Sequence, residues 1–379
     1  MNKESCLIIA GEKSGEEHAL SFLPQIIKKC PQVEFFGVGG DDFHKLGVDV
    51  LYHLRDFSSW GINDVLKKIP FYIKAFYTLL REVRKRNCKM AILVDFQDFN
   101  LKLAKKLKRR GVKVFYYVAP QAWAWKEYRT KALNNSVHTL FTILPFEKEW
   151  FSTRGVHKVK SVTHPLYAKY APFFLAQKSS TESTEKRKKI VLLPGSRNRE
   201  VRELLPLFVK ALQKWKQQDP DIFIVLVQAT SVAEEIYTQY QSSFDQIYQD
   251  VDLAQALAGA HFALAASGTV TLATALFQVP TVVCYRGSLL EEFIYQQFIT
   301  YRGPISLANI VLQKNIFPEL LQEQVTVENI LKYFKKWSED PQEYYRIKNV
   351  LKQIPILLQG EEFDFPNYFA QVLSEPSHV

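Results

Sequence analysis

The sequence predicts an α/β protein built from two doubly wound parallel-sheet domains. Short apolar runs alternate along the chain with segments of helical spacing, and this alternation occurs in both halves. A polar, charged stretch without periodicity, residues 177–189, separates the halves and indicates a linker. The 379 residues are enough for two domains of ordinary size. Strand–helix alternation in each half favours a parallel sheet covered by helices.

The first half begins with strands that run into glycine-bearing loops. Apolar runs predict its strands at residues 6–10, 33–38, 90–94, 112–118 and 140–144. A glycine loop follows each of the first two runs, which is typical of the carboxyl edge of a parallel sheet. Neither loop matches the dinucleotide fingerprint, so the pattern does not favour NAD. We place the first domain at residues 1–170.

The second half repeats the alternation. Its predicted strands are residues 190–193, 223–227, 246–248, 262–265 and 281–284, and its predicted helices are residues 200–217, 233–243 and 270–277. From residue 327 onward the spacing is mainly helical. We place the second domain at residues 171–349 and expect residues 350–379 to pack back on the first.

Composition narrows the class of partner. The net charge of +10 and pI near 9.2 indicate an anionic partner, either nucleic acid, an anionic membrane surface or a phosphorylated substrate. No nucleic-acid-binding module is recognisable, which disfavours the first. The four cysteines are scattered without a CxxC pair, so we expect reduced thiols in a cytoplasmic protein and no zinc site. No apolar run approaches the roughly 18 to 20 residues of a membrane span, so the protein is expected to be soluble or peripheral.

Residues 190–203 predict a strand that turns sharply into a helix. Gly195 permits backbone angles that other residues avoid, and Ser196 is a good N-cap residue. Arg197 lies in the turn, where its planar guanidinium could bind a diphosphate beside the positive end of the helix. The alternative is an ordinary turn with a solvated arginine. Residues 265–269 form a second turn of this kind, a candidate anion or sugar site that includes Ser267, Gly268 and Thr269.

Two carboxylates follow the strand at residues 90–94. Asp95 and Asp98 would lie at the carboxyl edge of the sheet, where acid–base catalysts are often placed. The alternative role for one of them is to cap the next helix, and both roles can hold at once. Trp123 and Trp125 beside Pro120 suit the wall of a cleft or core packing equally.

An aromatic stretch between residues 57 and 80 also carries lysines. Trp60, Phe71, Tyr72 and Phe76 are its candidate membrane contacts, because aromatics interleaved with lysine suit a lipid surface. The alternative is an amphipathic helix packed on the sheet.

Taken together, these stretches resemble the lipid-A-disaccharide synthases, a family of bacterial glycosyltransferases. The matching stretches occur in the family's order and are AGEKSGEEHA (10–19), GVGG (37–40), DFQDFN (95–100), VAPQAWAWK (118–126), LPFEKEWF (144–151), THPL (163–166), LLPGSRNREV (192–201), AASGTVTLATAL (265–276), ISLANIV (305–311) and PELLQ (318–322). The combination of WAW, LPGSR and SGT is specific.

The resemblance implies the glycosyltransferase-B architecture, with two Rossmann-like domains facing across a cleft. It implies inverting transfer of 2,3-diacylglucosamine from its UDP derivative to the 6-hydroxyl of 2,3-diacylglucosamine 1-phosphate. The products would be the β-1,6 lipid A disaccharide 1-phosphate of lipopolysaccharide and UDP, formed without a metal or cofactor. Such enzymes work as peripheral proteins at the cytoplasmic face of the inner membrane of Gram-negative bacteria.

The resemblance also implies roles for single residues. Asp98 or Asp95 would be the general base, and we favour Asp98 because it lies further into the loop. Residues from the second domain would bind the UDP-sugar, namely Ser196, Arg197, Ser267, Gly268, Thr269, Asn309 and Gln322. Glu12 and Ser14 would meet the acceptor.

Three positions depart from the family pattern. Glu16 follows Gly15 where the family has aspartate, and Thr163 replaces a glycine. Ala273 stands where a glutamate typically binds ribose hydroxyls, which suggests weaker donor binding or support from Thr271 or Thr274. Two other readings stay open: an enzyme acting on another UDP-sugar with a soluble substrate, and a non-catalytic nucleotide- or lipid-binding relative. Oligomeric state does not follow from the sequence.

Overall fold

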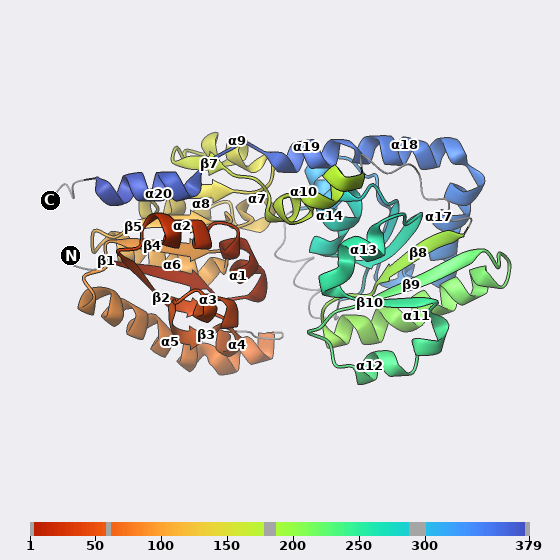
Figure 1. Cartoon of the computed structure of the whole chain (residues 1–379), viewed down its shortest axis with the longest axis horizontal. Coiled ribbons are helices and arrows are strands. Elements are labelled where there is room, and N and C mark those ends of the chain that lie inside the picture. Colours follow the sequence, from red (N-terminus) through yellow and green to blue (C-terminus); the bar gives the residue numbers. More distant parts are fainter. Residues whose placement is uncertain (1–3, 58–61, 178–186, 288–300, 376–379) are drawn as a thin grey trace. The chain divides into compact units, whose positions relative to one another are not determined.

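The computed structural model describes residues 4–57, 62–177, 187–287 and 301–375 (Figure 1). The contacts divide the chain into two units, Met1–Ala168 with Gln359–Val379, and Lys169–Leu358. Each unit contains one parallel sheet with helices, which confirms the predicted fold class. The chain returns to the first unit at Gln359 rather than near residue 350, because the helices up to Leu358 belong to the second unit.

The first sheet has seven parallel strands in the order β3-β2-β1-β4-β5-β6-β7. Their bounds are β1 Glu4–Ala10, β2 Val33–Gly39, β3 Asp49–His53, β4 Met90–Val94, β5 Lys113–Tyr117, β6 Thr139–Thr142 and β7 Val159–Ser161. The apolar runs predicted the central strands but did not predict the two edge strands, β3 and β7. The edge strands are short or half-exposed, so they lack the continuous apolar pattern of strands that are buried on both faces.

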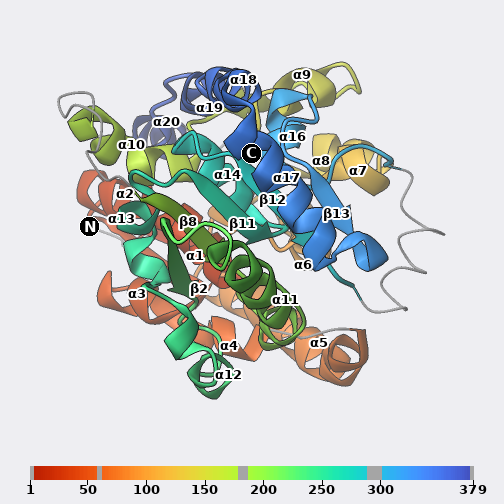
Figure 2. The ribbon, with the colours of Figure 1, turned by 90° about the vertical axis from the view of Figure 1, so that its right-hand side faces the viewer.

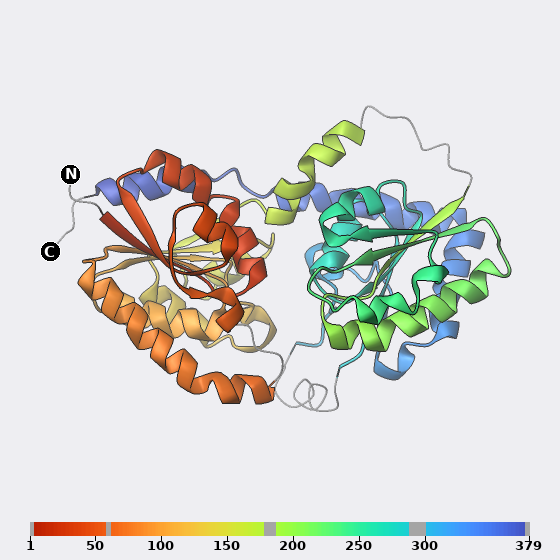
Figure 3. The same ribbon diagram turned by 60° about the horizontal axis from the view of Figure 1, so that its bottom comes forward.

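Helices cover both faces of the first sheet. Their bounds are α1 Lys13–Leu20, α2 Leu23–Lys29, α3 Asp41–Lys45, α4 Leu54–Phe57, α5 Ile62–Lys85, α6 Gln97–Lys108, α7 Ala122–Trp125, α8 Arg129–Ser136, α9 Glu147–Ser152 and α20 Phe365–Ser374. Residues of α5, α6 and α8 share one core cluster with the sheet, and Figure 3 shows α5 as the long helix along this unit. Residues of α1, α2 and α20 share the other cluster.

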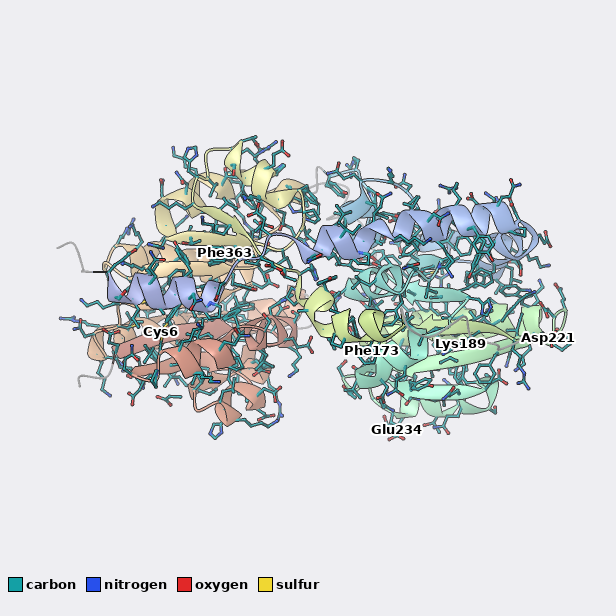
Figure 4. All side chains as sticks on the ribbon, turned by 45° about the horizontal axis from the view of Figure 1, so that its top comes forward. Cys6, Phe173, Lys189, Asp221, Glu234 and Phe363 are labelled. Atoms are coloured by element: carbon teal, nitrogen blue, oxygen red, sulfur yellow. The ribbon has the colours of Figure 1, made fainter. Side chains whose placement is uncertain are left out.

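The C-terminal segment completes the core of the first unit. The ring of Phe365 lies 4.5 Å from that of Phe141, and Phe363, labelled in Figure 4, lies 5.7 Å from the same ring. Lys113 Nζ donates to the carbonyl of Val372 at 3.1 Å. The sheet face would otherwise expose these apolar rings to water, so the last residues of the chain are part of this fold.

The second sheet has six parallel strands in the order β10-β9-β8-β11-β12-β13. Their bounds are β8 Lys188–Leu193, β9 Ile222–Gln228, β10 Gln246–Gln249, β11 Phe262–Ala266, β12 Thr281–Tyr285 and β13 Glu319–Leu321. The expected linker therefore ends before Lys188, and residues 178–186 lie outside the described chain. Lys189, labelled in Figure 4, is buried in the strand and donates to the carbonyl of Ala258 at 2.9 Å.

The helices of the second unit pack on this sheet. Their bounds are α10 Pro165–Gln177 (which starts in the first unit), α11 Asn198–Lys216, α12 Glu235–Thr238, α13 Leu253–Leu257, α14 Thr269–Leu276, α16 Leu307–Leu312, α17 Val327–Glu339, α18 Pro341–Leu351 and α19 Gln353–Gln359. Figure 2 shows α11 and α17 side by side. The helix expected at residues 233–243 is short and breaks into a 3-10 turn at Gln241–Ser243, because few of its side chains are buried.

Candidate active site

The candidate residues gather where each sheet reverses its strand order. In the first unit β1 pairs with both β2 and β4, and in the second unit β8 pairs with both β9 and β11. Helices diverge from such a point, so the loops after the two central strands leave room for a ligand at the carboxyl edge. Glu12 and Asp95 follow β1 and β4, whereas Arg197 and Ser267 follow β8 and β11.

The turn after β4 is strained and firmly held. Asp95 and Phe96 both have positive φ, 47° and 49°, which non-glycine residues rarely adopt. The buried Asn100 donates to the carbonyl of Val94 at 3.2 Å and to that of Asp95 at 2.8 Å. The Tyr116 hydroxyl donates to the Asp95 carbonyl at 3.1 Å. Strain that surrounding bonds maintain is typical of functional sites.

The glycine loop after β1 packs directly against this turn. A Cβ atom on Gly11 would lie 2.7 Å from the ring of Phe96, which is closer than atoms can approach. Gly11 therefore brings the loop that contains Glu12 next to Asp95. The sequence singled out this loop for its glycines but gave no sign that Phe96 is the reason for the first one.

Asp95 has an unusually basic carboxylate. Burial, and then the negative charge of Glu12, raise the pKa of Asp95 to about 6. A carboxylate with such a pKa is ionised at neutral pH and still accepts a proton readily. Glu12 is the exposed N-cap residue of α1, and Ser14 is exposed in its first turn.

Asp98 lies in the opposite electrostatic environment. Its Oδ1 accepts from Arg129 Nη2 at 2.5 Å and its Oδ2 from Lys126 Nζ at 3.4 Å. Although burial acts to raise the pKa of Asp98, the charges of Arg129 and Lys126 hold it below its usual value. The side chain of Arg129 is only 1% exposed, so Asp98 neutralises a buried cation. Neither basic residue was proposed as a site residue from the sequence.

A third acidic residue at this edge was also missed. Glu147 is fully buried, and its carboxylate accepts from Trp123 Nε1 at 3.0 Å and from the Leu144 amide at 3.2 Å. Burial raises the pKa of Glu147 to about 7, and Asp95 adds to the rise. The LPFE motif contains this residue, but its sequence signal resembles that of an ordinary first-turn glutamate. In the structure Glu147 fixes Trp123 of the WAW motif.

Glu16 and His164, two buried polar residues of the family motifs, have structural roles. The buried Glu16 accepts from the amides of Gly40 at 2.6 Å and Phe43 at 3.3 Å, so it joins the loops after β1 and β2. His164 is 2% exposed, and its Nδ1 accepts from the Leu166 amide at 3.1 Å. Burial lowers the pKa of His164 to about 3, so its ring is neutral.

The turn after β8 places an exposed arginine at the start of a long helix. Gly195 has a φ of +122°, and a Cβ there would lie 2.7 Å from an oxygen of Glu200. The N-cap residue of α11 is Arg197 and not Ser196, since the chain stays extended through Arg197. The Arg197 side chain is 62% exposed and pairs with Glu200 at 3.3 Å. An exposed guanidinium at a helix N-terminus suits an anionic group.

The SGT turn lies on the neighbouring strand. Leu193 at the end of β8 pairs with Ala265 near the end of β11, so the turns that follow are neighbours. Gly268 has a φ of +151° and open space at its Cβ position, and α14 begins at Thr269. The Ser267 hydroxyl donates to the carbonyl of Ile305 at 3.4 Å. This places backbone amides and hydroxyls beside the Arg197 turn.

The last two expected donor residues support loops. Asn309 is fully buried, and its amide donates to the Phe317 carbonyl and to Glu319, both at 2.8 Å. Its oxygen accepts from the amides of Ile316 and Phe317 at 2.9 Å. The half-buried Gln322 accepts from the Gly287 amide at 2.9 Å.

Ala273 and the two threonines near it are buried in α14. Ala273 itself is 1% exposed. Thr271 donates to the Gly268 carbonyl at 2.8 Å and Thr274 to the Thr271 carbonyl at 2.9 Å. Both threonines are fully buried and bonded within the helix, which disfavours direct contact with a donor, so support from Thr271 or Thr274 stays a prediction.

Most of the expected membrane aromatics face the core. Phe71, Tyr72 and Phe76 are partly buried against the first core cluster, and the Tyr72 hydroxyl donates to the Phe57 carbonyl at 2.7 Å. Trp60 lies outside the described residues. Among the side chains of α5 that the structure describes, the exposed apolar ones are instead Ile69 at 42%, Ile73 at 53% and Tyr77 at 65%. Their spacing of four places them on one face of the helix. Among the described residues, no helix combines the length and apolarity needed to cross a membrane.

Comparison with known sequences gives one consistent family. The family model described as lipid-A-disaccharide synthetase matches residues 6–372. A lipid-A-disaccharide synthase of Myxococcus xanthus is 34% identical over 87% of this chain and 86% of its own length. One from Syntrophus aciditrophicus is 33% identical over 87% of each chain.

Solved structures resemble the fold at much lower identity. A putative UDP-N-acetylglucosamine 2-epimerase from Listeria monocytogenes superposes with a TM-score of 0.59 at 9% identity, covering 98% of this chain and 96% of its own. A spinosyn rhamnosyltransferase superposes with a TM-score of 0.55 at 10% identity, covering 98% of this chain and 100% of its own. At these identities the likeness establishes the two-sheet architecture alone.

The effect of Glu12 on Asp95 can be measured directly. We expect Glu12→Gln to lower the pKa of Asp95 from about 6 toward its ordinary value, because a like charge is removed. Carbon-13 NMR titration of the aspartate carboxyl groups measures this pKa. Glu17→Gln, an exposed change on the same helix, is the control and should leave the pKa in place. An unchanged pKa in Glu12→Gln would show that burial alone sets it.

Proposed function

The chain belongs to the lipid-A-disaccharide synthetase family, and we propose that it transfers 2,3-diacylglucosamine from its UDP derivative to 2,3-diacylglucosamine 1-phosphate. It is thus a glycosyltransferase of lipid A biosynthesis. The acceptor's 6-hydroxyl attacks the anomeric carbon with inversion, giving the β-1,6 disaccharide 1-phosphate and UDP. The observation that carries this chemistry is a carboxyl with a pKa of about 6 at the strand-order reversal of the first sheet.

Asp95 is the proposed general base. The acceptor hydroxyl must lose its proton as it attacks, and a positioned base of suitable pKa typically contributes about 10²- to 10⁴-fold. Asp98 is less suited, because its two cationic partners keep the pKa of its carboxylate low. This choice replaces the sequence-based preference for Asp98, which rested only on its position in the loop. Burial and then the charge of Glu12 keep the pKa of Asp95 high, and Glu12 with Ser14 meets the acceptor.

The second unit is proposed to stabilise the leaving UDP. Arg197 and the N-terminus of α11 supply positive potential where the diphosphate gains charge, as a metal ion does in other transferases. Ser196 and the Ser267–Gly268–Thr269 turn contribute hydroxyls and amides from the two neighbouring loops. Asn309 acts through the loop that it holds, and Gln322 through the Gly287 segment.

The exposed face of α5 is proposed to contact the cytoplasmic surface of the inner membrane. Both substrates carry acyl chains, so the enzyme must collect them from a bilayer. Ile69, Ile73 and Tyr77 form an apolar stripe, and the exposed Lys74 lies beside it. The net charge of +10 favours an anionic lipid surface. The aromatic residues Phe71, Tyr72 and Phe76 hold this helix on the core instead of entering the lipid.

Replacing each aspartate should separate catalysis from stability. With the two diacylated glucosamine substrates, we expect Asp95→Asn to lower kcat by roughly 10²- to 10⁴-fold with little change in Tm, since it removes a base. The pH profile of kcat/KM should rise through about pH 6 in the unmodified enzyme. Asp98→Asn should mainly lower Tm, because it removes the carboxylate that neutralises the buried Arg129. A larger loss of kcat in Asp98→Asn than in Asp95→Asn would reverse the assignment.

Arg197 should matter far more than its neighbour. We expect Arg197→Ala to reduce kcat/KM by roughly 10²-fold or more, because a charge-assisted contact to the diphosphate is lost as it leaves. Arg199→Ala is the matched control, since Arg199 is also exposed and also pairs with a glutamate of α11, Glu203 at 2.9 Å, but lies within the helix rather than at its N-cap. Steady-state kinetics with varied UDP-sugar measures both. Equal losses in the two variants would contradict a specific diphosphate contact.

The apolar stripe of α5 should control binding to lipid. We expect Ile69→Ser combined with Ile73→Ser to weaken sedimentation with vesicles containing anionic phospholipid by roughly tenfold, since apolar contact area is removed. Ile356→Ser, which changes a 74% exposed isoleucine in α19, is the control. Undiminished binding by the double variant would exclude α5 as the contact.

A further inference from the structure

The second unit contains a cavity that the transferase chemistry does not use. Its volume is about 510 Å³, within the usual range for a small-molecule site. Apolar rings and charged side chains both line it. Its lining includes Arg302, Phe317, Tyr333, Lys336, Trp337 and Arg346.

This cavity is separate from the proposed donor turns. The helix α17 begins at Val327, shortly after β13, and runs away from the carboxyl edge of the sheet. Tyr333 and Trp337 lie six and ten residues further along, which is about 9 to 15 Å at the helical rise. The structure describes every donor residue proposed above. None of these residues lines the cavity.

The charges in the cavity favour an anionic ligand. Arg302, Lys336 and Arg346 line it together with two carboxylates, those of Glu319 and Glu343. The charge of Glu319 is already satisfied within the protein, because it accepts from the amides of Ile305 and Ser306, both at 2.9 Å, and from Asn309.

Glu343 marks the position of an anion. Its carboxylate accepts from Arg346 Nε at 2.5 Å and Nη2 at 3.0 Å, and lies 3.6 Å from Lys336 Nζ. Two cations therefore already converge on one negatively charged group. A phosphate offers more oxygen acceptors than this carboxylate and matches the fork of arginine.

The remaining walls are apolar and aromatic. Trp337 and Phe317 are almost fully buried, Tyr333 is half-buried, and Phe317 lies just before β13. Flat rings beside cations suit a ligand whose phosphate is attached to a carbon skeleton, rather than a free inorganic ion.

We propose that this cavity is a second ligand site that takes a small organophosphate. The phosphate binds Lys336 and Arg346 in competition with Glu343, and the carbon skeleton packs on Tyr333 and Trp337. A soluble sugar phosphate and the headgroup of an anionic phospholipid share this chemistry. The site does not depend on the proposed transferase mechanism.

A ligand in the cavity would also contact residues that hold the SGT turn in place. Gly303, Pro304 and Glu319 line the cavity. Glu319 holds the amide of Ile305, and the carbonyl of Ile305 accepts from the Ser267 hydroxyl. Binding in the cavity is therefore coupled through one residue to the SGT turn.

Nitrogen-15 NMR of tryptophan-labelled protein tests the site, because the chain has only six indoles to resolve. The Trp337 signal is assigned with Trp337→Phe and followed during titration with glucosamine 6-phosphate and, separately, with dihexanoyl phosphatidic acid below its micelle concentration. We expect a saturable shift with at least one probe. A response to the first alone identifies a soluble ligand, and a response to the second alone identifies a lipid headgroup.

Two charge changes should act in opposite directions. Lys336→Met should weaken binding by about fivefold and Glu343→Gln should tighten it by a similar factor, since one removes a cation and the other removes the competing carboxylate. Lys332→Met and Glu339→Gln, exposed changes on α17 outside the cavity, are the charge-matched controls. No saturable shift with either probe, or equal effects of the paired variants and their controls, would overturn the proposal.

Discussion

The parallel pairing of one central strand with two neighbours is the constraint on which both units depend. In the first sheet β1 pairs with β2 and β4, and in the second β8 pairs with β9 and β11. Parallel strands place all their carboxyl ends at one edge, and the reversal of strand order parts the helices there. The two sets of candidate residues follow these strands although they are distant in sequence. The same topology thus places the proposed proton acceptor in one unit and the proposed anion-binding turn in the other.

Burial gives different chemistry to side chains of the same type. Asp95 and Asp98 are three residues apart, yet burial and then a neighbouring carboxylate raise the pKa of the first, whereas two cations hold the pKa of the second low against the effect of burial. The difference arises because Asp95 lies in a left-handed turn that Asn100 holds, with Glu12 brought near by Gly11. Asp98 lies instead in the first turn of α6, within reach of Arg129 from α8. Such an arrangement separates a group that accepts a proton from a group that stabilises the fold.

The departures from the family pattern have unequal consequences. Glu16 has a structural role, because its longer side chain accepts hydrogen bonds from two backbone amides of the neighbouring loop. Ala273 is different, since the adjacent threonines are buried and bonded within their own helix. In the proposed function, donor binding therefore relies on the Arg197 and SGT turns without a glutamate at this position. The Ser267 hydroxyl of the SGT turn donates to the carbonyl of Ile305, whose amide donates to Glu319, and Glu319 lines the cavity beside β13.

The sequence by itself determined the alternation of strands and helices, the glycine turns at Gly11 and Gly195, and the acidic and basic motifs of a lipid A glycosyltransferase. These features depend on local periodicity and backbone conformation, which neighbouring residues set. Only the tertiary structure decided that Asp95 is the more basic aspartate, that Asn309 is buried, and that α5 exposes Ile69, Ile73 and Tyr77 in place of Phe71, Tyr72 and Phe76. The edge strands β3, β7 and β13 also became evident only in the tertiary structure. Burial and pKa depend on groups far apart in the chain, such as Glu12 beside Asp95 and Arg129 beside Asp98, and a linear pattern does not record those distances.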